Sequence, residues 1–298
     1  MKILKRELAA VVVALVLFAA SSASPSGVLQ PEHKLETASS HERADSNKVR
    51  VLFIGNSYTY VNNLPELVTG LAESAHRSLE TEMIVAPGAT LQKHWEDGKA
   101  VEVMKRGHWD YVVLQEQSTL GLVLAGGPPI NDPTMFHRYA RLFDSAIKSS
   151  GAKTIFLLTW ARQNLPATQA DLTSAYRAIA SELDDIVAPA GIAWQTALKK
   201  RPSLVLHQRD LSHPTPTGSY LAACVLYSTL YGKSAAGLTG RVSGNTVDTS
   251  GRLLESRGEQ GAAAGHARGE LVNLAKTDST FLQQVAWETV LEANRRHR

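Results

Sequence analysis

Short apolar runs alternate along the chain with segments of helical periodicity. The first run, residues 49–54, is rich in β-branched and aromatic residues and stops at Gly55, so it predicts a strand. Residues 64–78 then place leucine, valine and alanine at the spacing of one helix face. These two segments together predict a strand, a turn and a helix.

The same unit recurs further along the chain. We expect further strands at 82–86, 111–114 and 154–159, helices at 136–149 and 169–187, and a last short strand at 191–194. Strands that alternate with helices form parallel sheets, because each right-handed crossover lays its helix against the sheet. The pattern therefore predicts an α/β domain with helices on both faces of a parallel sheet.

Two later segments depart from this rhythm. Residues 232–269 contain many Gly, Ser, Arg and Glu residues and few large apolar ones, which predicts a loop insertion. Apolar residues between 282 and 291 recur at helical spacing and predict a terminal helix that docks on the core. We therefore expect residues 49–298 to form a single domain.

The N-terminal residues have the layout of a secretory signal peptide. Lys2, Lys5 and Arg6 precede the 13-residue apolar run 8–20, and small residues follow up to Ala23. This run is about two-thirds of the roughly 20 residues that a membrane-spanning helix needs, so we expect cleavage and no stable membrane insertion. Residues 24–48 are polar and aperiodic, as in a disordered tether. The protein is thus predicted to be secreted or otherwise extracytoplasmic.

The composition supports a globular core and argues against nucleic-acid binding. Of 298 residues, 44% are hydrophobic and 20% are charged, which excludes disordered and collagen-like classes. The net charge is +3, and no cluster of Lys and Arg stands out. The single cysteine, Cys224, cannot form an internal disulfide, and its apolar surroundings favour a buried side chain over a nucleophile.

Candidate chemistry begins where the first strand ends. Gly55-Asn56-Ser57 follows this strand directly and opens the turn into the next helix. Open α/β sheets bind ligands at this carboxyl edge, so the Ser57 hydroxyl is a candidate nucleophile. By themselves, Asn and Ser at such a junction are more often turn and helix-capping residues than catalytic ones.

A second group of candidate residues lies far along the chain, at Asp210-Leu211-Ser212-His213-Pro214. An Asp three residues before a His allows its carboxylate to hold one imidazole nitrogen while the other nitrogen faces a hydroxyl. That is the arrangement of base and orienting acid in serine hydrolysis. A turn-capping Asp beside an exposed His is the alternative interpretation of this segment alone.

In combination these blocks resemble the SGNH hydrolase superfamily, also called GDSL-like esterases. The resemblance covers roughly residues 49–231 and includes Gly88 after the second strand and a polar block after the third. It implies a three-layer, flavodoxin-like fold with a five-stranded parallel sheet of order 2-1-3-4-5. It also implies a catalytic triad of Ser57, Asp210 and His213.

The resemblance further implies an oxyanion hole built from Ser57, Gly88 and a side-chain amide of the third block. That block normally ends in Asn, but residues 112–118 read Val-Val-Leu-Gln-Glu-Gln-Ser. A glutamine can present the same NH2 donor. We expect Gln115, directly after the strand, to supply it, with Gln117 as the alternative.

Four further residues are candidates for substrate contact. Asn56 stands where the family usually has Asp, next to the nucleophile. Trp160 and Arg162 follow the fourth strand at the same sheet edge, and His207 lies close to the triad segment.

No cofactor or metal is expected. The clusters at 94–97 and 108–110 contain His and acidic residues but have no partner at metal-ligand spacing, which favours surface or capping roles. A secreted serine ester hydrolase that acts through an acyl-enzyme on a small-molecule or carbohydrate ester, such as an O-acetylesterase, is the main hypothesis. A non-catalytic carbohydrate- or ligand-binding protein is the alternative, and the same triad would also serve a lipase, thioesterase or acyltransferase. The sequence leaves the oligomeric state open.

Overall fold

The computed structural model describes residues 48–120, 122–123, 129–130, 133–256 and 265–296, which belong to one compact unit, Arg43–Arg298. The expected signal peptide at 1–23 and nearly all of the expected tether at 24–48 lie outside the described residues. Part of the expected insertion, residues 257–264, also lies outside them.

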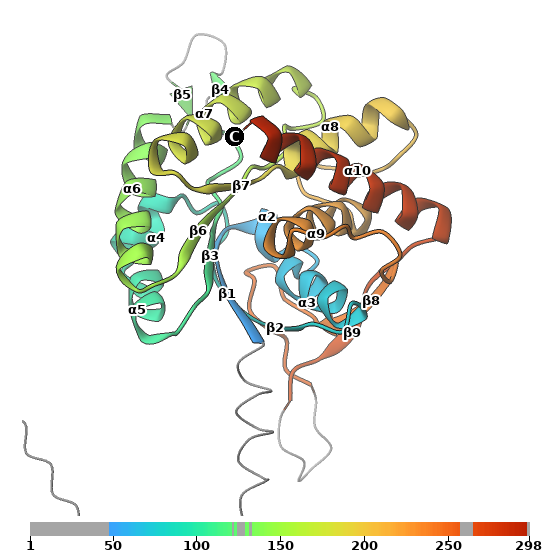
Figure 1. Cartoon of the computed structure of the whole chain (residues 1–298), viewed down its shortest axis with the longest axis horizontal. Helices are drawn as coiled ribbons and strands as arrows, with labels where there is room; N and C mark the ends of the chain where they lie inside the picture. The colour runs from blue at the N-terminus through green and yellow to red at the C-terminus, as the bar shows by residue number, and fades with distance from the viewer. Residues whose placement is uncertain (1–47, 121, 124–128, 131–132, 257–264, 297–298) are drawn as a thin grey trace, which may run out of the picture. The chain divides into compact units, whose positions relative to one another are not determined.

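A five-stranded parallel sheet forms the centre of this unit (Figure 1). Its strands are β1 (Lys48–Gly55), β2 (Ser78–Val85), β3 (Tyr111–Leu114), β6 (Lys153–Leu157) and β7 (Ile186–Ala188). The spatial order is β2-β1-β3-β6-β7, and every neighbouring pair is parallel. This is the 2-1-3-4-5 order, so the predicted fold class and strand order are confirmed.

Alternate residues of β1 pack into two separate hydrophobic clusters, one on each face of the sheet. Val51 and Phe53 pack into one hydrophobic cluster, whereas Leu52 and Ile54 pack into the other. Because successive side chains of a strand point to opposite faces, a strand buried on both faces is apolar throughout. This explains the unbroken apolar run that predicted β1.

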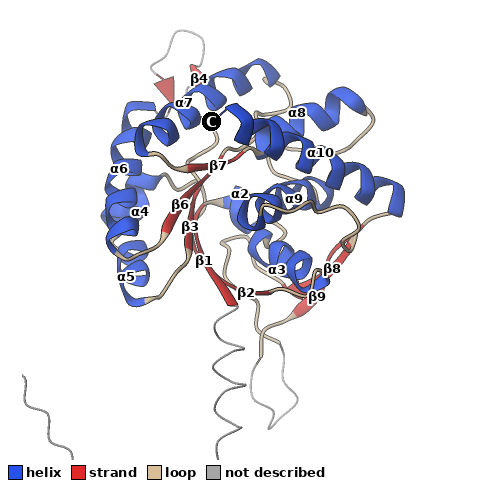
Figure 2. Ribbon diagram, viewed as in Figure 1, coloured by secondary structure: helices blue, strands red, loops and turns tan. Residues whose placement is uncertain are grey.

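Helices cover both faces of the sheet (Figure 2). The first face carries α3 (Leu64–Ser74), α8 (Ala190–Lys200), α9 (Pro216–Tyr231) and α10 (Lys276–Arg296). The opposite face carries α4 (Leu91–Asp97), α5 (Lys99–Arg106), α6 (Pro133–Ser149) and α7 (Gln169–Leu183). The expected terminal helix is α10, and Cys224 is buried within α9 as expected.

Several predicted boundaries are wrong. The second strand begins at Ser78 rather than at residue 82, and the preceding helix already ends at Ser74. The predicted strand at 191–194 lies within α8, and the fifth strand is 186–188 instead. A short buried apolar run reads alike as strand or helix, so periodicity alone does not separate them. The helices α4 and α5 were not predicted.

Two antiparallel strand pairs and one 3-10 turn lie outside the central sheet and the helices that cover it. The segment 232–269 contributes β8 (Arg241–Asn245), which pairs antiparallel with β9 (Arg268–Asn273), and Val242 joins the core cluster around α3. A second antiparallel pair joins β4 (Leu122–Val123) to β5 (Pro129–Ile130), and a 3-10 turn, η1, covers Pro166–Thr168. Among the described helices, none has the length and apolar character to cross a bilayer.

Candidate active site

Ser57 is the first residue of the short helix α2 (Ser57–Tyr60), which begins where β1 ends. The Asn56 side chain caps this helix, because its Oδ1 accepts a hydrogen bond from the backbone N–H of Tyr58 at 3.0 Å. The turn is too tight for a side chain at Gly55, whose Cβ would lie 2.6 Å from Gln115 Oε1. Strand end, glycine and cap therefore place the Ser57 hydroxyl at the carboxyl edge of the sheet.

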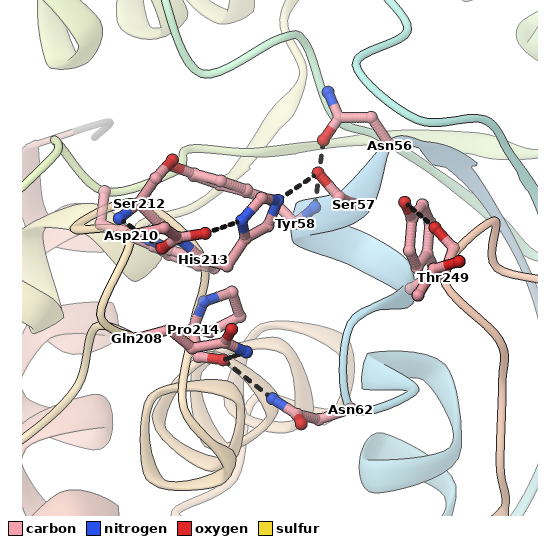
Figure 3. Close-up of polar contacts among 12 residues, drawn as sticks. Asn56, Ser57, Tyr58, Asn62, Gln208, Asp210, Ser212, His213, Pro214 and Thr249 are labelled. Atoms are coloured by element: carbon pink, nitrogen blue, oxygen red, sulfur yellow. Dashed lines mark hydrogen bonds and ion pairs between the residues drawn. The ribbon is translucent and has the colours of Figure 1, made fainter.

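The structure brings the three predicted triad residues together (Figure 3). Ser57 Oγ lies 2.8 Å from His213 Nε2. On the other side of the ring, His213 Nδ1 is hydrogen-bonded to Asp210 Oδ2. The imidazole thus bridges a hydroxyl and a carboxylate that are 153 positions apart in the sequence.

Asp210 is held in its ionised form by local hydrogen bonds. Partial burial pushes the pKa of its carboxyl upward, but the hydrogen bond from His213 and those from the backbone N–H groups of Ser212 and His213 outweigh this and hold the pKa at about 2. Both N–H groups donate to Oδ1 at 3.0 Å. Asp210 is therefore an anion at neutral pH and can orient the imidazole.

The loop that carries His213 is tied to the loop after the nucleophile. Asn62 Nδ2 and Gln208 Nε2 both donate to the carbonyl oxygen of Pro214, at 3.0 and 2.9 Å (Figure 3). Asn62 adopts a left-handed backbone conformation, with φ 59°, which Asn tolerates better than most residues. Sequence reasoning missed this residue, although adjacent asparagines at 62–63 are a turn signal.

A pocket of about 260 Å³ opens beside Ser57 and His213. Its lining residues are Asn56, Ser57, Tyr58, Tyr60, Pro87, Gly88, Gln117, Ser118, Arg162, Ser212 and His213. Gly88, which follows β2, has a φ of 63°, a conformation that favours glycine. The ends of β2, β1, β3 and β6 thus all contribute residues to one pocket, as the strand order requires.

Gln115 does not line this pocket. It is fully buried, and its Oε1 accepts hydrogen bonds from the Asn56 backbone N–H and the Thr59 hydroxyl, both at 2.9 Å. Its Nε2 donates to the carbonyl oxygen of Glu116 at 2.5 Å. Our expectation that Gln115 presents its amide to the substrate is therefore wrong for this conformation. Its side chain instead holds Asn56, the residue before Ser57.

Gln117, the alternative, is the glutamine that lines the pocket. Its Oε1 accepts hydrogen bonds from the Thr119 hydroxyl, at 2.6 Å, and from the Thr119 backbone N–H. Because a backbone N–H can only donate, the bonded end of the amide has to be the oxygen. Thr119 thereby fixes the orientation of this amide in the pocket wall.

Trp160 and His207 were expected to contact substrate, but neither lines the pocket. Trp160 is buried between the stacked rings of Tyr58 and Trp194, and its Nε1 donates to the Ser212 carbonyl oxygen at 3.1 Å. His207 is also buried, and its Nε2 is hydrogen-bonded to the Ala161 carbonyl oxygen at 3.1 Å. Both side chains therefore lie in the interior, and Trp160 is bonded there to the segment that carries Asp210 and His213. Of the four candidates, only Asn56 and Arg162 line the pocket.

Tyr58 is a site residue that sequence reasoning did not single out. Its hydroxyl lies 2.7 Å from Ser212 Oγ, and its ring meets the His213 ring edge-on. Burial raises the pKa of Tyr58, so it stays a neutral phenol at neutral pH. Its position directly after Ser57 in a buried helix is the only sequence signal for it.

Within the residues that the structure describes, His, Cys, Asp and Glu side chains form no group of three able to hold a metal ion.

Sequence comparison matches the chain to no family model and to no curated protein. Structural comparison finds similar solved structures. A structure from Slackia heliotrinireducens, whose description proposes an SGNH hydrolase, is 25% identical, with a TM-score of 0.50 over 62% of this chain and 100% of its own. A Bacteroides uniformis protein of the DUF4886 family is 14% identical, with a TM-score of 0.56 over 83% of this chain and 96% of its own.

A third similar structure is a variant of an acetyl-xylooligosaccharide esterase from Geobacillus. It is 16% identical, with a TM-score of 0.51 over 61% of this chain and 94% of its own. At such identities the likeness of the last two structures concerns the fold. Sheet order and layer arrangement agree with these neighbours, and the chain has the fold of the SGNH, or GDSL-like, hydrolases.

Proposed function

We propose that this protein is a serine ester hydrolase in which Ser57 is the nucleophile, His213 the general base and Asp210 the orienting acid. One observation carries the proposal: His213 Nε2 lies 2.8 Å from Ser57 Oγ while the Nδ1 of the same ring is held by Asp210. This distance is within the range that proton transfer between nucleophile and base needs. A structural role for the three side chains would not require a hydroxyl at the edge of a pocket.

The reaction proceeds in two acyl transfers. In the first, His213 takes the Ser57 proton as the oxygen attacks the ester carbonyl, and the protonated imidazole then gives this proton to the departing alcohol. In the second, His213 takes a proton from water, which attacks the acyl-enzyme, and Ser57 recovers its proton as the acid leaves. The ionised Asp210 stabilises the imidazolium in both steps.

The oxyanion of each tetrahedral intermediate needs donors on the other side of the carbonyl. We assign this role to the backbone N–H groups of Ser57 and Gly88 and to the side-chain amide of Gln117. All three residues line the pocket beside the nucleophile. The assignment replaces Gln115 with Gln117, because the amide of Gln115 is engaged inside the protein.

The size of the pocket favours a short acyl group. A volume of about 260 Å³ lies below the roughly 300–1,000 Å³ of pockets that enclose drug-sized ligands. The N-terminal signal-peptide pattern suggests export from the cytoplasm, and esters of polysaccharides are available outside it. One similar structure is described as an acetyl-xylooligosaccharide esterase. We therefore propose a carbohydrate O-acetylester as the substrate class. A lipase would instead favour long acyl chains, a thioesterase would favour thioesters, and an acyltransferase would favour acceptors other than water.

Labelling with an active-site serine phosphonate, followed by peptide mapping, tests the nucleophile. We expect one adduct, on Ser57, and loss of both the adduct and the hydrolysis of 4-nitrophenyl acetate in Ser57→Ala. Ser118→Ala is the matched control, since Ser118 is a second serine in the same pocket. The Ser118→Ala variant should still be labelled on Ser57. A folded wild-type protein that takes no label and hydrolyses no short ester would instead favour the non-catalytic binding protein.

The length preference is tested with 4-nitrophenyl esters of increasing acyl length. The expected order of kcat/KM falls from acetyl to octanoyl, because the pocket has little room for a long chain. A maximum at octanoyl would contradict the acetylesterase assignment and favour a lipase, while leaving the triad intact.

A further inference from the structure

Arg162 is the one cation among the residues that line the described pocket if His213 is neutral. It follows β6 at the carboxyl edge of the sheet. Its Nε is buried and has no hydrogen-bond partner, and within the described ranges its guanidinium forms no ion pair. A guanidinium is charged at all physiological pH values and can only donate. A guanidinium in the wall of a pocket with no acceptor among the described residues is available to a ligand that supplies one.

The carboxylates on the loops of the site are engaged with other groups. Asp210 accepts hydrogen bonds from His213 and from two backbone N–H groups. Glu116 accepts from the backbone N–H of Leu91 at 3.1 Å and from that of Gln117 at 2.6 Å. Neither forms an ion pair with Arg162 in the described part of the chain. Among the described residues of these loops, no carboxylate therefore pairs with Arg162, which lines the pocket.

The backbone around Arg162 is fixed to the triad loop. The N–H of Gln163 donates to the Leu211 carbonyl oxygen at 2.9 Å. The N–H of Ala161 donates to Gln169 Oε1 at 2.7 Å, and the Ala161 carbonyl oxygen bonds to His207 at 3.1 Å. The neighbours of Arg162 on both sides are therefore anchored, which fixes the backbone from which its side chain reaches the pocket.

Arg162 and the proposed oxyanion donor Gly88 reach the pocket from strands that are not neighbours in the sheet. Gly88 follows β2 and Arg162 follows β6, and β1 and β3 lie between these strands. At roughly 4.8 Å between neighbouring strands, the two strand ends are about 14 Å apart. Ser57, at the end of β1, lies between them. An oxyanion held at Gly88 therefore leaves the guanidinium to meet another part of the substrate.

We propose that Arg162 binds a carboxylate on the substrate, so that the enzyme is specific for esters that carry an anionic group near the reacting carbonyl. This inference rests on the proposed ester hydrolase function. The planar guanidinium can donate two parallel hydrogen bonds to a carboxylate. The carboxylate belongs either to the acyl part, as in a half-ester of a dicarboxylic acid, or to the alcohol part, as in an acetylated uronic acid.

The test compares matched pairs of esters. For the acyl part, the pair is 4-nitrophenyl hemisuccinate and its neutral methyl ester; for the alcohol part, it is 4-acetoxybenzoate and its methyl ester. Kinetics are measured for the wild type, Arg162→Gln and Arg162→Lys. Arg209→Gln is the control, because Arg209 is exposed on the triad loop and does not line the pocket. Comparing each pair between variants cancels the intrinsic reactivity of the esters.

In at least one pair, we expect Arg162→Gln to lower kcat/KM for the anionic ester by about 10- to 100-fold, the range of a hydrogen bond to a charged group, and that for the neutral ester by less than about threefold. Arg162→Lys should retain part of the preference, and Arg209→Gln should leave it unchanged. Circular dichroism and thermal unfolding confirm that each variant is folded.

Three results would overturn the proposal. An equal loss on both members of a pair would mean that Arg162 acts at the reacting carbonyl or supports the fold. In a second result, the wild type hydrolyses the neutral esters while Arg162→Gln leaves the ratio of kcat/KM between anionic and neutral ester unchanged in both pairs. That result would refute the anion site and would support the hydrolase function. A folded wild type that cleaves none of the esters would refute the hydrolase function itself, and the anion site with it.

Discussion

The side-chain oxygen of Gln115 accepts a hydrogen bond from the backbone N–H of Asn56 at 2.9 Å, so a residue at the end of β3 holds the peptide that precedes the nucleophile. The same oxygen accepts from the Thr59 hydroxyl, inside α2. Asn56 in turn donates from Nδ2 to the Ala89 carbonyl oxygen at 2.9 Å, in the loop after β2. Three strand-end loops are thereby locked together around Ser57.

Replacing Gln115 with Ala should lower both stability and activity. The substitution leaves the buried N–H of Asn56 and the Thr59 hydroxyl without this acceptor, which costs about 1–3 kcal/mol for a buried unsatisfied group. Activity should fall because the nucleophile turn loses its anchor. Urea unfolding and kcat for 4-nitrophenyl acetate measure the two effects. A variant of unchanged stability would contradict the positioning role.

Gln117→Ala should lower activity strongly and stability only slightly. Loss of one oxyanion donor typically lowers kcat by about 10²- to 10³-fold. The side chain is only partly buried, so the free energy of unfolding should change little. The same two assays distinguish this outcome from that of Gln115→Ala. An unchanged kcat would remove Gln117 from the proposed oxyanion hole.

Trp160→Ala should destabilise the protein by about 3–5 kcal/mol, because a large buried aromatic side chain is lost. Trp160 stacks on Tyr58 at 4.7 Å and on Trp194 at 4.1 Å between ring centroids. The milder Trp160→Phe keeps most of the ring but loses the hydrogen bond to Ser212, so it should cost less while leaving the ranking of ester substrates unchanged. Chemical unfolding and kcat/KM over the ester series provide the measurements. A stable Trp160→Phe protein with altered preference would restore the residue as a substrate contact.

Asp185 should make the protein less stable as the pH rises from about 4 to about 7. Burial, together with a hydrogen bond to Asp144, raises the pKa of the Asp185 carboxyl to about 7, although Lys148 opposes this. Since this value lies above that of the unfolded chain, the native state binds more protons between about pH 4 and 7, and stability falls with pH across that window.

Asp185→Asn removes this titration. The melting temperature of the variant relative to wild type should therefore increase from pH 4 to pH 8. Asp184→Asn is the control, since Asp184 is exposed and its left-handed conformation, with φ 55°, also suits Asn. A difference between Asp185→Asn and wild type that does not vary with pH would contradict the raised pKa.

The α/β class and the candidate residues Ser57, Asp210 and His213 could be predicted from the sequence alone. The apolar run of β1 reports burial on both faces of the sheet, and that information is local. The blocks around Ser57 and His213 are short, yet their order along the chain pointed to the superfamily. The signal peptide at 1–23 also follows from local composition and stays a prediction.

Which of the candidate side chains line the pocket depends on the folded structure. Gln115 and Gln117 are two residues apart in one segment, but Gln115 is bonded to Asn56 of another strand-end loop, whereas Gln117 is bonded to Thr119 of its own loop. Trp160 and His207 follow the same logic, since the sequence places them near the sheet edge, whereas packing against Trp194 and Ala161 turns them inward. A side chain's direction at a strand end depends on contacts with distant segments, and such contacts exist only after the chain has folded.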